Sequence, residues 1–221
     1  MQESQPQPKK IWERPIRKGP IPTLNRIARD NEIHEQEKIN SKIDFLTGAL
    51  KRELLEPRLN ELINELRNES RIPEGGNRRP SNRLGFMVIL LDLDRFKQIN
   101  DKYGHIVGDQ ALVLFGERLN KVLDRKEIDR IYRYGGDEFV MVLPIDSAKN
   151  VSNEELNALF QRKEREVNEN LFTREGEKIE ASMGYAIFRK GDKDKSPEKI
   201  IQEADEDMYR NKKDRKLNQA R

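Results

Sequence analysis

The sequence predicts an α/β domain built on a mixed, partly antiparallel sheet. Three observations support this prediction: an apolar run over 84–91 is typical of a buried strand, two further apolar runs flank a Gly-Gly pair, and segments of helical periodicity lie between the strands. Because strands and helices alternate along the chain, we expect the helices to cover one central sheet.

The first 43 residues differ in composition from the rest of the 221-residue chain. Residues 1–30 hold seven Lys or Arg against three acids, together with five of the ten prolines. This composition favours a basic arm, and the scattered apolar residues up to 43 allow a short helical stalk. We therefore expect a partly disordered arm and stalk over 1–43 and one folded domain over 44–221.

The folded domain begins with an amphipathic segment and a polar loop. Leucine and isoleucine recur at helical spacing over 49–70, and Pro57 should kink this helix or restart it. Residues 67–83 are rich in Gly, Pro, Ser, Asn and Arg and lack periodicity, which predicts an exposed loop.

The middle of the chain predicts a strand, a helix and a hairpin. The run over 84–94 is apolar and rich in branched residues up to its acidic end, which is typical of a strand buried on both faces. Apolar residues at helical spacing over 107–123 predict a helix. Two strand-like runs then surround Gly135 and Gly136, which favours a tight hairpin.

The last third of the chain predicts two helices around a strand. Ser152 and Glu155 have the spacing of a capping box at the start of one helix. Residues 180–188 are typical of a strand, and the final helix is predicted to begin at Ser196 with Pro197 in its first turn.

Composition excludes several classes of protein. The chain has no cysteine, which excludes disulfide scaffolds, thiolate metal sites and thiol nucleophiles. The longest apolar run, 86–91, is far shorter than the roughly 20 residues needed to cross a bilayer, and the first ten residues lack the pattern of a secretory signal. We expect a cytoplasmic protein without a membrane span. A formal charge of +3 does not indicate a nucleic-acid partner, although the basic arm keeps that as a minor alternative.

Acidic residues follow the predicted strands at two places. Asp92 and Asp94 end the run over 84–94, and Asp137 and Glu138 follow the Gly-Gly pair. We expect only one of Asp92 and Asp94 to face a site beside Asp137. Carboxylates from two neighbouring strands suit Mg²⁺ and therefore phosphoryl or nucleotidyl transfer. For each segment alone, a plain hairpin turn with solvated strand ends is the favoured alternative.

Four segments taken together favour a functional site over the plain hairpin turn. These are DFLTGALKR at 44–52, LDLDRFKQINDKYGHIVGDQAL at 91–112, RYGGDEF at 133–139 and ADEDMYRNKK at 204–213. Over roughly residues 40–217 the sequence strongly resembles the GGDEF-domain diguanylate cyclases. The resemblance implies a nucleotidyl-cyclase-like, palm or ferredoxin-like domain. It also implies that two GTP molecules are condensed into cyclic di-GMP, with release of pyrophosphate, across a homodimer in which each subunit holds one GTP.

The resemblance also implies roles for individual residues. Asp92, the backbone carbonyl of Leu93 and Asp137 hold two Mg²⁺ ions, which Mn²⁺ could replace. Asp137, helped by Glu138, assists deprotonation of the attacking hydroxyl, and Lys97 stabilises charge on the phosphates. The remaining substrate-binding positions that the resemblance implies are Phe96, Asn100, His105, Asp109, Gly135, Gly136, Lys212 and Lys216.

The base specificity is implied by two of these positions. Guanine presents N1–H and an exocyclic amine as a donor pair, which a carboxylate such as Asp109 can accept together with Asn100. Relatives that make mixed cyclic dinucleotides carry serine at the position of Asp109, so the expected product is cyclic di-GMP. A helix cap at Asn100 and a dipole-favoured acid at Asp109 are structural alternatives that are compatible with binding.

The chain departs from the family pattern at several positions. Lys126 and Asp129 occupy the family's product-inhibition site, where the first residue is normally arginine. Because lysine lacks the two-pronged donor pair of arginine, we expect weak product inhibition. Arg215 stands where the family usually has glycine, and a basic helix end that satisfies its own carbonyls is an alternative role for Lys216.

These departures leave a second function open, a catalytically inactive GGDEF module that binds GTP or a signalling partner. The residues before Asp44 are too few for the sensor domain that most relatives carry. We therefore expect pairing of two subunits to depend on the stalk, on an upstream regulatory partner or on a missing part of a longer chain.

Overall fold

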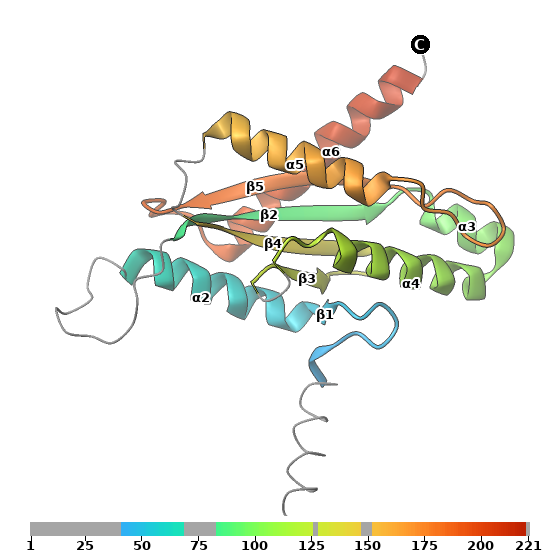
Figure 1. Ribbon diagram of the computed structural model, residues 1–221, viewed down its shortest axis with the longest axis horizontal. Coiled ribbons are helices and arrows are strands. Elements are labelled where there is room, and N and C mark those ends of the chain that lie inside the picture. The colour runs from blue at the N-terminus through green and yellow to red at the C-terminus, as the bar shows by residue number, and fades with distance from the viewer. Residues whose placement is uncertain (1–40, 69–82, 126–127, 147–151, 220–221) are drawn as a thin grey trace, which may run out of the picture. The chain divides into compact units, whose positions relative to one another are not determined.

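The computed structural model describes residues 41–68, 83–125, 128–146 and 152–219 (Figure 1). Residues 1–40 of the arm and stalk predicted over 1–43, most of the predicted loop over 67–83 and Lys126 lie outside the described residues.

The described residues form a central sheet of five strands in the order β1-β3-β4-β2-β5. The β1 and β3 strands are parallel, and every other neighbouring pair is antiparallel. This arrangement confirms the prediction of a mixed, largely antiparallel sheet flanked by helices. The strands are β1 Leu50–Lys51, β2 Arg83–Leu93, β3 Arg130–Arg133, β4 Glu138–Asp146 and β5 Ala181–Arg189.

Helices cover both faces of this sheet (Figure 1). Side chains of α4 and α5 share one apolar cluster with the sheet, and side chains of α2 and α6 share the other. The helices are η2 Arg52–Leu54, α2 Leu55–Asn68, α3 Phe96–Tyr103, α4 His105–Val122, α5 Asn153–Asn168 and α6 Pro197–Gln219.

The central strand β2 explains the longest apolar run of the sequence. Phe86 and Leu90 are buried in the cluster with α2 and α6, whereas Met87 and Ile89 are buried in the cluster with α4 and α5. Alternate side chains of a strand point to opposite faces, so a strand with a helical layer on each side must be apolar at successive positions. The prediction of a strand buried on both faces is confirmed.

The starts of the last two helices are also confirmed. Ser152 Oγ accepts from the Glu155 N–H, and the Glu155 carboxylate accepts from the Ser152 N–H, which is a complete capping box. Before α6, Ser196 Oγ accepts from the Lys199 N–H at 3.3 Å. Pro197 is the first residue of α6, where its missing N–H removes no helical hydrogen bond.

The prediction of a helix over 49–70 was wrong in its first part. Leu50 and Lys51 pair with Tyr132 and Arg133 as strand β1, a 3-10 turn follows, and the α-helix begins only at Leu55. Sheet hydrogen bonds to β3 therefore outweigh the helical spacing of the leucines. Pro57 lies in the first turn of α2 and does not interrupt it.

The helix α3 was not predicted as a separate element. Gly104, with a φ of 83°, separates it from α4. This left-handed conformation suits glycine because glycine has no Cβ. In the described segments, no helix has both the length and the apolar character that a membrane span requires.

Candidate active site

The turn between β3 and β4 is held by the last residue of β3. Arg133 donates from Nε and Nη2 to the carbonyl oxygen of Gly136 at 3.2 and 2.8 Å, and its Nη1 lies 3.0 Å from Asp44 Oδ1. A guanidinium presents several donors in one plane and can make these contacts at once. One side chain therefore fixes both the Gly-Gly turn and the segment before β1.

Asp44 organises the segment that Arg133 reaches. The N–H and the hydroxyl of Thr47 donate to Asp44 Oδ1 at 3.0 and 2.7 Å. Burial by itself would raise the pKa of Asp44, but the hydrogen bonds from Thr47 and the charge of Arg133 outweigh it, so the pKa lies below its ordinary value. The Thr47 carbonyl packs on Gly116 of α4, where an added Cβ would lie 2.4 Å from that oxygen. The segment over 44–47 thus links α4 to the turn.

Both acids at the end of β2 meet the same lysine from α6. Lys212 Nζ lies 2.6 Å from Asp92 Oδ1 and 3.8 Å from Asp94 Oδ1. Ser182 Oγ donates to Asp94 Oδ1 at 2.7 Å. Both carboxylates thus contact Lys212, but only Asp92 is among the groups whose charge raises the pKa of Asp137. That only one of the two acids faces a site beside Asp137 stays a prediction.

Asp137 and Glu138, at the start of β4, lie close enough to Asp92 for its charge to raise their pKa values. Burial and the negative charge of Asp92 raise the pKa of Asp137. Burial, followed by the charges of Asp92, Asp137 and Asp205, raises the pKa of Glu138. Asp92 and Glu138 are direct partners in the antiparallel ladder between β2 and β4. The ends of the two strands therefore concentrate negative charge beside the Gly-Gly turn.

Lys212 offsets part of this charge. Burial would lower the pKa of Lys212, but the hydrogen bond and charge of Asp92, together with the charges of Asp94 and Asp137, outweigh burial and raise it. The ammonium occupies a place where the acids favour a positive charge.

The donor groups fit a hard divalent cation. Within the described ranges, no group of three or more His, Asp or Glu side chains could hold a metal ion by itself. Mg²⁺ usually takes one or two carboxylates and completes its shell with water and substrate phosphates, so two carboxylates such as Asp92 and Asp137 would suffice as protein ligands. Leu93 follows Asp92, and its N–H donates to the carbonyl oxygen of Asp137 at 3.2 Å.

The two glycines of the turn differ in what surrounds them. A Cβ added at Gly135 would lie 2.4 Å from Glu138 Oε2, whereas a Cβ added at Gly136 would meet no heavy atom of the described chain within 4 Å. Neither is among the described glycines with a left-handed φ. The packing and conformation of the described residues thus do not explain a glycine at 136, and the open space beside it suits a ligand that approaches the backbone closely.

The residues predicted to read guanine lie on the hairpin of α3 and α4. His105 and Asp109 are exposed and four residues apart, so they share one face of α4. The Asn100 side chain lies against Gly108, where an added Cβ would be 1.9 Å from Asn100 Oδ1. This oxygen is buried and accepts no hydrogen bond from the residues that the structure describes. The fold therefore places Asn100 beside the turn of helix that carries Asp109.

The other predicted substrate residues lie at the ends of α3 and α6. Phe96 is half-buried against the apolar cluster of α4 and α5, and the Lys97 side chain is exposed. Arg215 Nη1 lies 3.2 Å from the Ala181 carbonyl oxygen and 3.8 Å from Asp94 Oδ2. Lys216 belongs to α6, but its side chain lies outside the described residues.

Asp129, one residue of the predicted inhibition site, is already engaged within the chain. The Arg125 N–H and Nη2 donate to its two carboxylate oxygens, both at 3.0 Å, and the side chain is buried. Burial raises the pKa of Asp129 against the opposing charge of Arg125. Any ligand of Asp129 must compete with this arginine.

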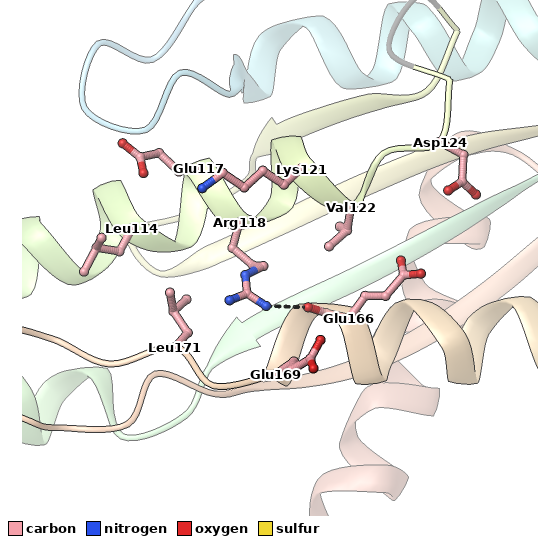
Figure 2. A pocket seen from close by; sticks show the side chains of 9 residues that line it. All are labelled: Leu114, Glu117, Arg118, Lys121, Val122, Asp124, Glu166, Glu169 and Leu171. Atoms are coloured by element: carbon pink, nitrogen blue, oxygen red, sulfur yellow. Dashed lines mark hydrogen bonds between the residues drawn. The ribbon is translucent and has the colours of Figure 1, made fainter.

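A hollow of about 380 Å³ lies between the C-terminal parts of α4 and α5 (Figure 2). Arg118 crosses it and donates to the carbonyl oxygen of Glu166 at 2.9 Å. None of the predicted site residues lines this hollow. It is therefore separate from the acids at the ends of β2 and β4.

Three residues of the site were missed by the sequence reasoning. Arg133 and Ser182 orient the turn and Asp94, and Gly184 lets α6 lie directly on β5, because an added Cβ would be 2.0 Å from the Met208 nitrogen. A glycine inside an apolar strand is a recognised sign of close backbone approach, so Gly184 could have been found. The roles of Arg133 and Ser182 depend on contacts that have no local sequence signal.

The fold and these acids define a class of α/β domains whose acidic site lies at the end of a central antiparallel strand pair. A family model described as "Diguanylate cyclase, GGDEF domain" matches residues 41–218. The chain belongs to the GGDEF-domain diguanylate cyclase family.

Curated relatives and solved structures are consistent with this membership. Diguanylate cyclase DgcP of Pseudomonas aeruginosa is 31% identical over 81% of this chain and 24% of its own length. Diguanylate cyclase DosC of Escherichia coli is 36% identical over 58% of this chain and 27% of its own length. The chain thus spans about a quarter of the length of these two relatives.

Two solved structures share the fold. The coiled coil and GGDEF domain of DgcB from Caulobacter crescentus, in complex with c-di-GMP, has a TM-score of 0.66 at 23% identity, covering 85% of this chain and 88% of that one. Diguanylate cyclase SiaD of Pseudomonas aeruginosa, in complex with its activator SiaC, has a TM-score of 0.60 at 26% identity, covering 86% and 68%.

Proposed function

We propose that this domain is an active diguanylate cyclase that condenses two GTP molecules into cyclic di-GMP and releases two pyrophosphates. The observation that carries the proposal is the Lys212 ammonium held between Asp92 and Asp94, at 2.6 and 3.8 Å, beside a turn whose Gly136 borders open space. A cation-binding cluster of acids next to a backbone that a ligand can approach closely is what a metal-bound triphosphate needs.

The reaction forms two phosphodiester bonds between the two nucleotides. The 3′-oxygen of one GTP attacks the α-phosphorus of the other, a P–O bond forms, and the bond from the α-phosphorus to the bridging oxygen breaks, so that pyrophosphate leaves with the electron pair. The attacking hydroxyl loses its proton to the Asp137 carboxylate. The same step with the two nucleotides exchanged closes the ring. Because each subunit holds one GTP, the reaction requires two copies of the chain related by a two-fold axis.

Different residues of this chain have different roles in the reaction. Asp92, Asp137 and the Leu93 carbonyl would hold Mg²⁺ ions, which neutralise the triphosphate and polarise the attacked phosphorus when bound. In the metal-free protein, burial and the charge of Asp92 raise the pKa of Asp137. Lys97 and Lys212 would bind the phosphates.

Guanine is read by the hairpin of α3 and α4. The Asp109 carboxylate accepts from the N1–H and the amine of the base, and Asn100 lies beside it. His105, four residues before Asp109, borders the same pocket. Asp109→Ser removes the ionised acceptor, so it should lower the preference for GTP over ATP.

The pairing of two copies needs control, and we assign it to a regulatory partner or to the segment that precedes the domain. SiaD, a structural relative, is described in complex with an activator. GTP is a cytoplasmic nucleotide, so the domain works in the cytoplasm.

Incubation with GTP and Mg²⁺, followed by mass spectrometry for cyclic di-GMP, tests the proposal. The specific activity should rise with protein concentration, because two subunits must meet, and Asp137→Ala should make no product. A wild-type protein that binds GTP but forms no product at high concentration is the inactive binding module instead. A protein that binds no GTP in the presence of Mg²⁺ rules out both functions.

A further inference from the structure

Three side chains of α6 bind the outer edge of the sheet, next to Asn168 of α5, which also bonds to the Ala181 backbone. The β5 strand is the last in the sheet order, so one row of its backbone groups faces away from β2. The Tyr185 N–H donates to Asp207 Oδ2 at 3.0 Å, Asn211 Nδ2 donates to the Met183 carbonyl oxygen at 3.0 Å, and Arg215 Nη1 donates to the Ala181 carbonyl oxygen at 3.2 Å. We call the residues Asp207, Asn211 and Arg215 the edge zipper.

The three contacts have nearly the same spacing along the helix as along the strand. Successive zipper residues are four apart on α6, and four helical residues rise about 6 Å. Their partners on β5 are two apart, and two strand residues span roughly 6.6 Å. The helix and the strand therefore stay in step over three contacts, and a shift of α6 along β5 breaks all three together.

The close approach of the helix makes these contacts reachable. Gly184 lies between the first two partners on β5, and a Cβ there would be 2.0 Å from the Met208 nitrogen and 2.6 Å from the Ala204 carbonyl oxygen. The backbone of α6 thus rests on the strand itself, and side chains as short as Asp207 and Asn211 reach the strand edge.

The zipper surrounds the place where Lys212 meets the acids. Lys212 directly follows Asn211, and Asp92 pairs in register with Ser182, which lies between the partners of Asn211 and Arg215. Lys212 Nζ reaches Asp92 Oδ1 at 2.6 Å from this position. The contacts that set the register of α6 on β5 therefore also set where Lys212 stands.

We propose that Asp207, Asn211 and Arg215 are positioning residues that lock the register of α6 on the edge strand and so aim Lys212 at the acids of β2. The proposal rests on the proposed function only for the consequence that Lys212 then binds the triphosphate. Arg215 strengthens the last contact because it also forms an ion pair with Glu164 of α5 and lies 3.8 Å from Asp94.

A test without nucleotide addresses the locking itself. Carbodiimide coupling joins ammonium and carboxylate groups that touch, so digestion and mass spectrometry should find Lys212 joined to Asp92 in the wild type. The double variant Asn211→Ala with Arg215→Ala should lose about tenfold in this product. Lys213→Ala, which removes an exposed charge from the same turn of α6, should leave the yield unchanged. An unchanged yield in the double variant overturns the proposal.

A second test asks whether the zipper acts through Lys212. Binding of a GTP analogue with a methylene group between the α- and β-phosphorus is measured with Mg²⁺ by calorimetry. The double variant should bind about five- to tenfold more weakly than the wild type, and this effect should disappear when Lys212→Ala is present in both. Equal weakening with and without Lys212 means that the zipper only stabilises the sheet edge, which overturns the proposal.

Two further measurements cover the cases in which the double variant does not fold or the wild type does not bind the analogue. If the double variant does not fold, Arg215→Lys and Asn211→Gln, which keep the charge or the amide, take its place. Each should reduce the coupling yield and the affinity for the analogue, but by less than the double variant would. If the wild type binds no analogue, the proposed function fails, but the coupling yield still decides whether the zipper holds Lys212 on Asp92.

Discussion

Adding one methyl group at Gly136 separates the stability of the domain from its nucleotide binding. In Gly136→Ala the new Cβ meets no heavy atom of the described chain within 4 Å, and Gly136 is not among the described glycines with a left-handed φ. Such a substitution normally stabilises a protein by about 0.4–1 kcal/mol, because it restricts the unfolded chain. For a chain of this size, that is a rise in Tm of about 1–4 °C.

The same methyl group occupies the space that the proposed nucleotide needs. We expect Gly136→Ala to weaken binding of the uncleavable GTP analogue by at least about tenfold, which corresponds to roughly 1.4 kcal/mol. Thermal unfolding followed by circular dichroism gives the stability, and calorimetry with Mg²⁺ gives the affinity. If the variant binds the analogue as tightly as the wild type does, the ligand does not approach this turn and the assignment of the site is refuted.

Gly116→Ala is the matched control, because it adds the same methyl group where the protein itself fills the space. Its Cβ would lie 2.4 Å from the Thr47 carbonyl oxygen, so the backbone of one segment must move. Overpacking of this kind costs about 1–3 kcal/mol, or a fall in Tm of about 2–12 °C. Opposite changes in Tm for the two variants are the expected result.

Three other predictions follow from the charges of the site. A raised pKa means that Asp137 favours folding below its ordinary pKa and disfavours it once pH exceeds the raised value, so Asp137→Asn should raise Tm at pH 7, less so at pH 4, and abolish product formation. The lowered pKa of Asp44 gives stability above its ordinary value of 3.8 that is lost as pH falls through the lower folded value. Arg133→Met should therefore destabilise the protein by about 1–3 kcal/mol at pH 7, and the difference should shrink in acid as Asp44 becomes protonated in the folded state. Product inhibition should be weak, because the resemblance implies an arginine where this chain has Lys126, and because Asp129 is engaged within the chain; a low-micromolar inhibition constant that Lys126→Ala removes would contradict this.

Much of the fold could be predicted because local patterns and packing agree. Strand β2 is apolar at successive positions because it is central and buries side chains in the apolar clusters on both faces of the sheet. The capping box of Ser152 is complete within four residues. The helical spacing gave a wrong prediction where the same residues could form either a helix or a strand. Residues 49–54 have leucines at helical spacing, but Leu50 pairs with Tyr132, which is 82 residues away, and a helical period contains no information about such a partner.

The candidate site was predictable as a set of residues but not as a set of contacts. The resemblance implied roles for Asp92, Asp137 and Lys212, and the fold places these residues at adjoining strand ends and on the helix that covers them. The roles of Arg133 and Ser182 were not predicted. Arg133 joins the nearby Gly136 to Asp44, and Ser182 binds Asp94, and both of these acids lie far away in the sequence.

The position of α6 shows most clearly where sequence reasoning ends. The helix itself follows from its start signal at Ser196 and Pro197, but the sequence does not state how far it lies along β5. A slide by one turn, about 5.4 Å, keeps a helical side chain on the same face and would still bury an apolar stripe. Polar contacts at fixed intervals distinguish one register from the next, since hydrogen bonds are lost within a fraction of that distance. The polar residues of α6 that face the strand edge therefore carry the information that the apolar pattern lacks, and the aim of Lys212 depends on them.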